Sequence, residues 1–235
     1  MKIKGVEFGG SPRAAAVITG ALDKRAVTRA VREGADLIEV RVDTFADRSL
    51  PALKAAFERA LCTAPALPVI LTVRSAREGG RYPIPDRVRA EIFEALLPFA
   101  DLVDIELSSV KSLRSVMDLA VRRGKKVIVS YHNFKSTPVE LRLRAIVEKA
   151  RASGAHIVKI AAMARGRADF RRLAGLLAGS KGLIVIAMGP VGGPSRVFFP
   201  LLGSLVTYGS LGDETAPGQL PLKTLARELR FFESL

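Results

Sequence analysis

One lysine stands in the middle of an apolar run, and its position calls for a chemical explanation. Lys159 lies in the segment AHIVKIAAMA, residues 155–164, whose other residues are almost all apolar or β-branched. Removing an ammonium group from water is costly, so such a lysine either extends its amine to solvent or is buried with a lowered pKa. A buried amine of lowered pKa is a nucleophile that forms imines with carbonyl compounds. The residue type by itself leaves both interpretations open.

The two histidines of the chain differ in their surroundings. His132 ends the run KVIVSYH and precedes the loop NFKS, whereas His156 begins the run that contains Lys159 and has the opposite strand parity. We expect His156 on the helix-facing side or at the surface. An imidazole titrates near neutral pH, which suits His132 to general acid–base catalysis. A lysine that forms an imine with a ketone, beside a histidine that removes the neighbouring C–H proton, is the minimum apparatus for imine chemistry.

The elements that would position these residues alternate along the chain. Segments with apolar residues at helical spacing, such as Leu53 to Leu61 and Leu113 to Ala120, separate β-branched runs that start about 22 to 33 residues apart. Such alternation predicts parallel strands with right-handed crossovers. We therefore predict an α/β fold, a closed (β/α)8 TIM barrel forming a single domain over residues 1–235, in preference to an open doubly wound sheet. The expected strands are residues 14–19, 36–42, 68–74, 101–106, 126–132, 155–160, 182–188 and 204–209.

Helix boundaries have their own signals. The segment TPVE predicts a helix that Thr137 caps, with Pro138 in its first turn and Glu140 completing a capping box. Gly34, Gly124 and Gly154 follow predicted helices at positions where a left-handed residue is favoured.

Charged residues gather where these strands end. Strand side chains alternate between two faces, so Glu39, Arg41 and Asp43 share one face, as do Asp104 and Glu106. The outward face of a barrel strand packs on helices and is apolar, which turns the charged face inward. Active sites of such barrels lie at the carboxyl ends of the strands. The sequence therefore predicts a polar pocket there, formed by Glu39, Arg41, Arg74, Glu106, His132 and Lys159.

Three loops complete the predicted site. REGGRYP, residues 77–83, contains Glu78, which we expect to orient His132, and its Gly79–Gly80 pair suits either a mobile lid or a plain turn. The loops MGPVGGPSR and GDETAPGQLPL follow the last two strands, where glycine-rich loops often bind phosphate. The planar guanidinium of Arg196 suits a carboxylate equally well. A phosphate site and a carboxylate site both remain open.

Composition narrows the class of partner. The formal net charge is +14 and the aromatic content 6%, without a dense basic tail, which favours a small anionic substrate over nucleic acid. A nucleic-acid-binding protein, which would bind with steep salt dependence, is the alternative of another class. Neither a signal peptide nor a membrane span is recognisable, so we expect no membrane partner. Cys62 is the only cysteine, which excludes an internal disulfide and suits the cytoplasm.

Taken together, these segments resemble the type I 3-dehydroquinate dehydratases of the shikimate pathway, in which aromatic amino acids are made. The resemblance runs from about Ala14 to Leu222 and rests on the set EVRVD, TVRSAREGGRY, VSYHNF, GAHIVKIA, AMGPVGGPSR and TAPGQLP. It implies a lyase, more closely a hydro-lyase, that converts 3-dehydroquinate to 3-dehydroshikimate by syn elimination of water through a lysine Schiff base. It implies no metal and no organic cofactor.

The resemblance also implies roles for individual residues. Lys159 would form the imine, His132 would move the protons, and Glu78 would support His132. The substrate would be bound by Glu39, Arg41, Arg74, Met188, Arg196, Thr215 and Gln219. Thr215 stands where the family commonly has serine, His156 replaces a residue that is often acidic, and the N-terminus is short, so the strand hairpin that closes the barrel bottom in larger members is expected to be reduced.

Two alternatives remain open at this point. The chain is also compatible with another Schiff-base-forming barrel lyase, such as a class I aldolase that acts on a phosphorylated sugar. Members of the family often form homodimers, and the amphipathic segment LKTLARELRFFESL suits either a dimer contact or packing on the barrel.

Overall fold

The computed structural model describes residues 1–61, 67–212 and 214–233. Cys62, the single cysteine, lies outside the described residues.

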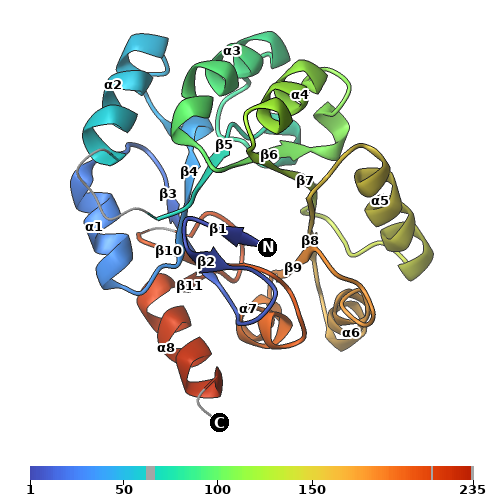
Figure 1. Cartoon of the computed structure of the whole chain (residues 1–235). Helices are drawn as coiled ribbons and strands as arrows, with labels where there is room; N and C mark the ends of the chain where they lie inside the picture. The colour runs from blue at the N-terminus through green and yellow to red at the C-terminus, as the bar shows by residue number, and fades with distance from the viewer. Residues whose placement is uncertain (62–66, 213, 234–235) are drawn as a thin grey trace.

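A ring of parallel strands forms the centre of the molecule, with the helices outside it (Figure 1). Every strand predicted from the sequence is confirmed, and each pairs in parallel with its neighbour from β10 through β3 to β9. The seam between β9 and β10 is closed by the Leu205 N–H, which donates to the Leu183 carbonyl at 2.8 Å. The strands are β3 (Ala14–Ile18), β4 (Leu37–Arg41), β5 (Val69–Thr72), β6 (Leu102–Glu106), β7 (Lys126–Asn133), β8 (Ile157–Met163), β9 (Leu183–Met188) and β10 (Thr207–Ser210).

A helix follows each of these strands and covers the outer face of the ring (Figure 1), which is the predicted (β/α)8 barrel. The helices are α1 (Lys24–Arg32), α2 (Leu50–Leu61), α3 (Asp86–Leu96), α4 (Arg114–Arg122), α5 (Glu140–Ala152), α6 (Arg167–Gly175), α7 (Gly192–Leu201) and α8 (Leu222–Glu233). Short 3-10 turns follow three of the strands, namely η1 (Val42–Thr44), η2 (Ala76–Glu78) and η4 (Leu107–Ser109), and η3 (Leu97–Phe99) continues α3. A short strand, β11 (Leu220–Pro221), pairs with β10 just before α8.

The strand parity predicted from the sequence divides the core into two layers. Ile38, Val40 and Val42 pack outward with the helices, whereas Leu37 belongs to a second apolar cluster inside the barrel. The interior cluster extends from Leu37 and Leu102, near the amino ends of their strands, to Met188 at the end of β9, where polar side chains such as Glu39 and Lys159 also point inward. The ring of packed strands thus provides a rigid frame for a site at one end.

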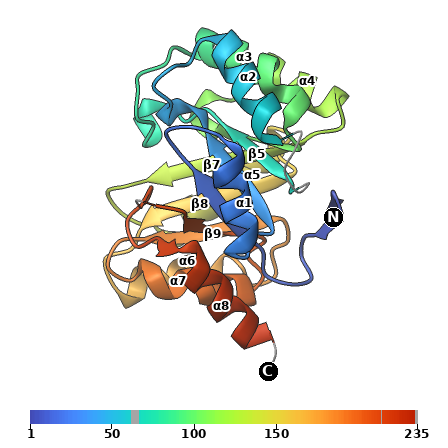
Figure 2. The same cartoon turned by 90° about the vertical axis from the view of Figure 1, so that its left-hand side faces the viewer.

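A two-stranded hairpin, β1 (Lys2–Ile3) and β2 (Val6–Glu7), lies at the other end of the barrel, away from the strand arrowheads (Figure 2). Phe8 follows it and is buried in the interior cluster, and Lys4 forms an ion pair with Asp101 at 2.9 Å. The hairpin therefore closes the barrel bottom with strands of two residues each.

The helix ends test the capping predictions. Gly34, Gly124 and Gly154 have φ of 95°, 70° and 98°, so the left-handed helix ends are confirmed. The capping box at Thr137 is wrong. Helix α5 begins at Glu140 after Val139, and the Thr137 hydroxyl instead donates to the Met163 carbonyl at 2.7 Å. A tertiary hydrogen bond to the end of β8 takes the hydroxyl that a local cap would use.

Among the described residues, no helix is both long and apolar enough to cross a membrane.

Candidate active site

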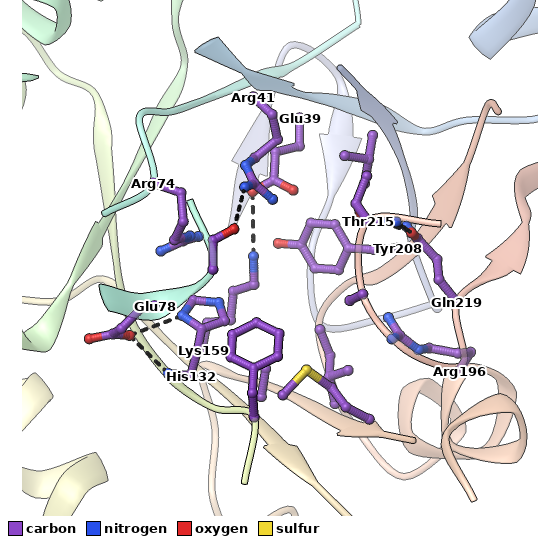
Figure 3. Close-up of a pocket in the computed structure, with 17 residues that line it drawn as sticks. Glu39, Arg41, Arg74, Glu78, His132, Lys159, Arg196, Tyr208, Thr215 and Gln219 are labelled. Carbon is purple, nitrogen blue, oxygen red and sulfur yellow. Dashed lines mark hydrogen bonds and ion pairs between the residues drawn. The ribbon is translucent and has the colours of Figure 1, made fainter. Parts of the chain in front are cut away.

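Lys159 lies on β8 inside the barrel, at the floor of a pocket that opens at the carboxyl ends of the strands (Figure 3). Its side chain is 6% exposed, and its Nζ lies 3.0 Å from Asp104 Oδ2 and 3.4 Å from Glu39 Oε1. Burial by itself lowers the pKa of Lys159, but the attraction of Asp104 and Glu39 outweighs burial and raises it. The expectation that burial lowers this pKa is therefore wrong, because two carboxylates face the amine.

Asp104 is the closest anion to the lysine amine, and sequence analysis did not include it among the site residues. It is fully buried on β6, accepts a hydrogen bond from the Ser130 hydroxyl at 2.6 Å, and pairs with Arg74 at 2.9 Å. Although burial works against ionisation, the charges of Arg74 and Lys159 hold the pKa of Asp104 well below its usual range. Its parity with Glu106 on the strand was the signal that could have identified it.

His132 ends β7, the neighbour of β8, and is held by Glu78. Glu78 Oε2 accepts from the backbone N–H of His132 at 3.0 Å and lies 3.1 Å from its Nδ1 (Figure 3). Burial and the charges of Arg74 and Lys159 hold the pKa of His132 well below its usual value, although Asp104 acts in the opposite direction. A carboxylate only accepts, so ionised Glu78 places the imidazole proton on Nδ1 and the lone pair on Nε2. His132 is therefore a neutral base.

The loop that carries Glu78 is tightly packed. The Gly80 N–H donates to the Ser75 carbonyl at 2.9 Å, and a Cβ at Gly80 would lie 2.2 Å from the Arg74 carbonyl oxygen. Gly79 has a φ of 87° and packs against the ring of Phe134. The two glycines are therefore required by close approach of the backbone. Ser108 adds a hydrogen bond to Glu78 at 2.6 Å, and burial raises the pKa of Glu78.

A bidentate pair holds the loop after β4. Asp43 accepts from Arg41 Nε and Nη2, each at 2.8 Å, and also from the backbone N–H groups of Arg74 and Arg81. Arg41 also donates to the Gly79 carbonyl at 3.1 Å, which ties this corner to the loop of Glu78. These contacts fix the orientation of Arg41 at the pocket wall.

Glu106 is not part of the pocket wall, contrary to the expectation that it points into the pocket. It is fully buried and is bound by Arg74, by the Ser75 N–H and by Arg89 of α3. Glu106 thus anchors the guanidinium of Arg74, whose other partners are Asp104 and Ser130. Arg89 of α3 supplies the positive charge that draws Glu106 away from the pocket.

The opposite wall contains an anion site. Arg196 on α7 is 2% exposed, and its Nε and Nη2 have no hydrogen-bond partner among the described residues. Burial lowers the pKa of Arg196 to about 10, so the guanidinium remains charged at neutral pH. Near it, the Gln219 side-chain oxygen accepts from the Thr215 N–H at 2.8 Å and the Thr215 hydroxyl at 2.9 Å. A buried guanidinium with two nitrogens that lack a hydrogen-bond partner among the described residues is suited to binding a carboxylate or phosphate.

The structure places all ten residues to which the resemblance gives catalytic or substrate-binding roles around this one pocket, and all of them except Met188 are labelled in Figure 3. Sequence analysis missed Tyr208 of β10, whose ring centroid lies 4.1 Å from Lys159 Nζ. His156, which we expected on the helix-facing side or at the surface, is exposed. In the described part of the chain, no group of three or more His, Cys, Asp or Glu residues is arranged to hold a metal ion. The pocket thus combines an amine, a neutral imidazole and an anion site.

Comparisons with known proteins identify the family of this chain. The profile of type I 3-dehydroquinase matches residues 17–235. The chain is 40% identical to the 3-dehydroquinate dehydratase of Aquifex aeolicus over 86% of this chain and 90% of the relative. It is 36% identical to that of Thermodesulfovibrio yellowstonii, over 90% and 92%.

A solved structure shares the fold as well. The crystal structure of 3-dehydroquinate dehydratase from Geobacillus kaustophilus superposes with a TM-score of 0.89 at 29% identity, covering 100% of this chain and 96% of that one. The family profile, the relatives and the pocket all lead to one assignment, and the chain belongs to the type I 3-dehydroquinase family.

Proposed function

We propose that this protein dehydrates 3-dehydroquinate to 3-dehydroshikimate through an imine on Lys159. The observation that carries the proposal is the buried Lys159 amine at the pocket floor, with the neutral His132 on the adjacent strand. Family membership supports a hydro-lyase rather than an aldolase acting on a phosphorylated sugar. The Arg196 guanidinium, whose Nε and Nη2 have no hydrogen-bond partner among the described residues, suits the single carboxylate of the substrate.

The chemistry begins with the lysine. Once the ammonium of Lys159 has released a proton, its amine attacks the ketone carbon of the substrate to give a carbinolamine. The carbinolamine hydroxyl takes up a proton and leaves as water, which gives an iminium ion. This cation withdraws electrons from the adjacent C–H bond, and His132 Nε2 removes that proton to give an enamine. The enamine expels the hydroxyl one carbon further on. His132 returns its proton to that hydroxyl, so water leaves, and hydrolysis of the imine releases product and Lys159.

The remaining pocket residues bind and orient the substrate. Glu39 and Arg41 bind substrate hydroxyls, Arg196 binds the carboxylate, and Thr215 with Gln219 closes over the ring. Met188 packs beside the imine. Arg74 shapes the pocket by holding Asp104, because its guanidinium is occupied by Asp104, Glu106 and Ser130. Glu78 keeps His132 in the tautomer that has its lone pair on Nε2. This scheme uses neither a metal nor an organic cofactor.

Borohydride trapping tests the proposal. The protein is incubated with 3-dehydroquinate and reduced, and the intact protein and its peptides are weighed. We expect a substrate-dependent adduct on Lys159 and, before reduction, the absorbance of the conjugated product. Lys159→Ala should form neither, while Lys126→Ala on the neighbouring strand should form both. Absence of adduct and absorbance in the wild-type protein would overturn the dehydratase, and phosphorylated sugars would then be tried.

We also propose the wider setting of this enzyme. Residues 1–235 form one catalytic domain, and the single cysteine favours the cytoplasm. A homodimer is supported by exposed apolar side chains on α7, directly after it and on α8, namely Phe198, Leu202 and Phe231, which are 47%, 54% and 57% exposed. Light scattering of the purified protein measures the mass directly, and a monomer at micromolar concentration would contradict the dimer.

A further inference from the structure

Tyr208 is the pocket residue whose chemistry the scheme above leaves unused. Its side chain points into the barrel from β10, is 3% exposed and lines the same pocket as Lys159 (Figure 3). The ring and the hydroxyl of Tyr208 have different surroundings. The face of the ring covers the Lys159 amine, at 4.1 Å from Nζ to the centroid, which is cation–π distance.

In the part of the chain that the structure describes, no atom lies at hydrogen-bond distance from the Tyr208 hydroxyl, although the Lys159 ammonium is close enough to counteract part of the effect of burial on its pKa. Buried tyrosine hydroxyls nearly always have a hydrogen-bond partner, because burial without a partner forfeits the hydrogen bonds made to water. Arg196 is the other residue of this pocket with buried polar atoms lacking a partner among the described residues. Thr207, which precedes Tyr208, also has such a hydroxyl but faces away from the pocket. A missing partner inside a binding pocket points to an atom that the ligand supplies.

Strand order determines which part of the ligand that is. His132 lies on β7, which pairs with one edge of β8, while Tyr208 lies on β10, beyond β9 on the other edge. The two side chains therefore approach Lys159 from opposite sides. When Nζ is bonded to the ketone carbon, the carbon that loses its proton faces His132. The other neighbouring carbon, which bears a hydroxyl in 3-dehydroquinate, faces Tyr208.

We propose that Tyr208 is a further substrate-binding residue, whose hydroxyl donates a hydrogen bond to the substrate hydroxyl on the carbon next to the imine. The inference rests on the proposed function and extends it to specificity. Burial raises the pKa of Tyr208, so its hydroxyl keeps its proton and remains a donor at neutral pH. An α-hydroxy ketone is thereby distinguished from a ketone without that hydroxyl.

Tyr208→Phe tests the inference, because it removes the hydroxyl and keeps the ring over Lys159. We expect KM for 3-dehydroquinate to rise about tenfold, the effect of one lost hydrogen bond to substrate, with kcat changed by less than about twofold. Tyr131→Phe is the matched control. Tyr131 lies on β7, outside the pocket, and its hydroxyl accepts from Asn133 at 3.2 Å, so its loss should leave KM unchanged.

The outcomes separate the inference from the proposed function. An unchanged KM in Tyr208→Phe, or an equal rise in both variants, would overturn the role of the hydroxyl. A fall in kcat at constant KM would overturn it too, because the group would then act in the transition state. Trapping on Lys159 should succeed in the wild type and in both variants. If wild-type trapping fails, the proposed function itself is wrong, whatever the two KM values are.

Discussion

Lys159 and His132 are neighbours, and the shifts in their pKa values leave Lys159 charged and His132 neutral. Both are buried, and burial opposes a positive charge on either side chain. Lys159 faces Asp104 and Glu39, which restore its charge, whereas His132 faces the cations of Arg74 and Lys159 and stays neutral. The resting site therefore contains an ammonium beside a free base. This distribution suits a reaction in which the base must be ready before the substrate arrives.

The neutrality of His132 predicts the pH dependence of turnover. A lowered pKa keeps the imidazole unprotonated to pH values below its ordinary pKa of about 6.5. The acidic limb of kcat/KM against pH should accordingly lie below that value. Glu78→Gln should shift this limb, since the residue contacts His132, while Glu94→Gln on the far side of α3 should not. A limb at or above pH 6.5 in the wild-type protein would contradict the neutral base.

Asp104 is predicted to control the charge of Lys159. Asp104→Asn removes the nearer carboxylate, so the pKa of Lys159 should fall. Carbamylation by cyanate, followed across pH by peptide mass, reports the fraction of neutral amine. Its midpoint should move to lower pH in Asp104→Asn.

Glu106→Gln is the matched control for this prediction. Glu106 pairs with the same Arg74 guanidinium as Asp104 but makes no contact with Lys159. Its replacement disturbs the arginine without removing a charge from the lysine, so the midpoint should remain at the wild-type value. Equal shifts in the two variants would show that Arg74, and not Asp104, sets the charge of Lys159.

At the scale of the elements, the short turns after the strands carry carboxylates that position side chains on the strands. Asp43 lies in η1 and Glu78 in η2, and both fold back over the strand ends that precede them. Asp43 joins the β4 and β5 loops by accepting backbone N–H groups from Arg74 and Arg81. The carboxylates of these turns therefore hold Arg41 and His132 in position.

Gly80→Ala is the prediction that belongs to this scale. A Cβ there would meet the Arg74 carbonyl at 2.2 Å, so the loop must move away together with Glu78. We expect a loss of roughly 1 to 3 kcal/mol in the free energy of unfolding and a fall in kcat as His132 loses its partner. Gly175→Ala on α6, where a Cβ meets nothing within 4 Å, is the control. It should be neutral or stabilising, and similar losses in both would refute this role of the loop.

At the scale of the whole molecule, the same buried charges couple stability to pH. His132 has a lowered pKa in the folded state, so the unfolded chain takes up its proton first, and stability falls as the pH drops below about 6.5. Asp43 and Asp104 also have lowered pKa values, because their cations outweigh the effect of burial. Their contribution is complete above their ordinary pKa of 3.8 and is lost as the pH falls through the lower folded values.

Urea unfolding from pH 8 to pH 3 checks this behaviour. The free energy of unfolding should fall in two stages, the first with a slope of up to about 1.4 kcal/mol per pH unit from His132. The raised pKa of Glu78 acts in the opposite sense at the acidic end. His132→Gln should abolish the first stage, whereas His156→Gln, at the surface, should leave most of it. Persistence of that stage in His132→Gln would assign it to other groups.

Much of this protein is determined locally by the sequence. The alternation of β-branched runs with helical periodicity specifies the barrel, because each strand and helix buries an apolar face of its own period. Strand parity specifies which side chains point inward, and that rule placed Glu39, Lys159 and His132 at one end. These inferences succeed because they depend on spacing along a single element.

Only the tertiary structure decides how the inward residues are paired. The charge of Lys159 depends on Asp104, which is 55 residues away in sequence, and the position of His132 depends on Glu78, which is 54 away. Likewise, Thr137 binds Met163 instead of capping its own helix, and Glu106 turns to Arg89 of α3. Electrostatic and hydrogen-bonding energies act over a few ångströms in space, whatever the separation along the chain. The sequence therefore determines which chemical groups enter the barrel, while the fold determines the charge that each of them carries.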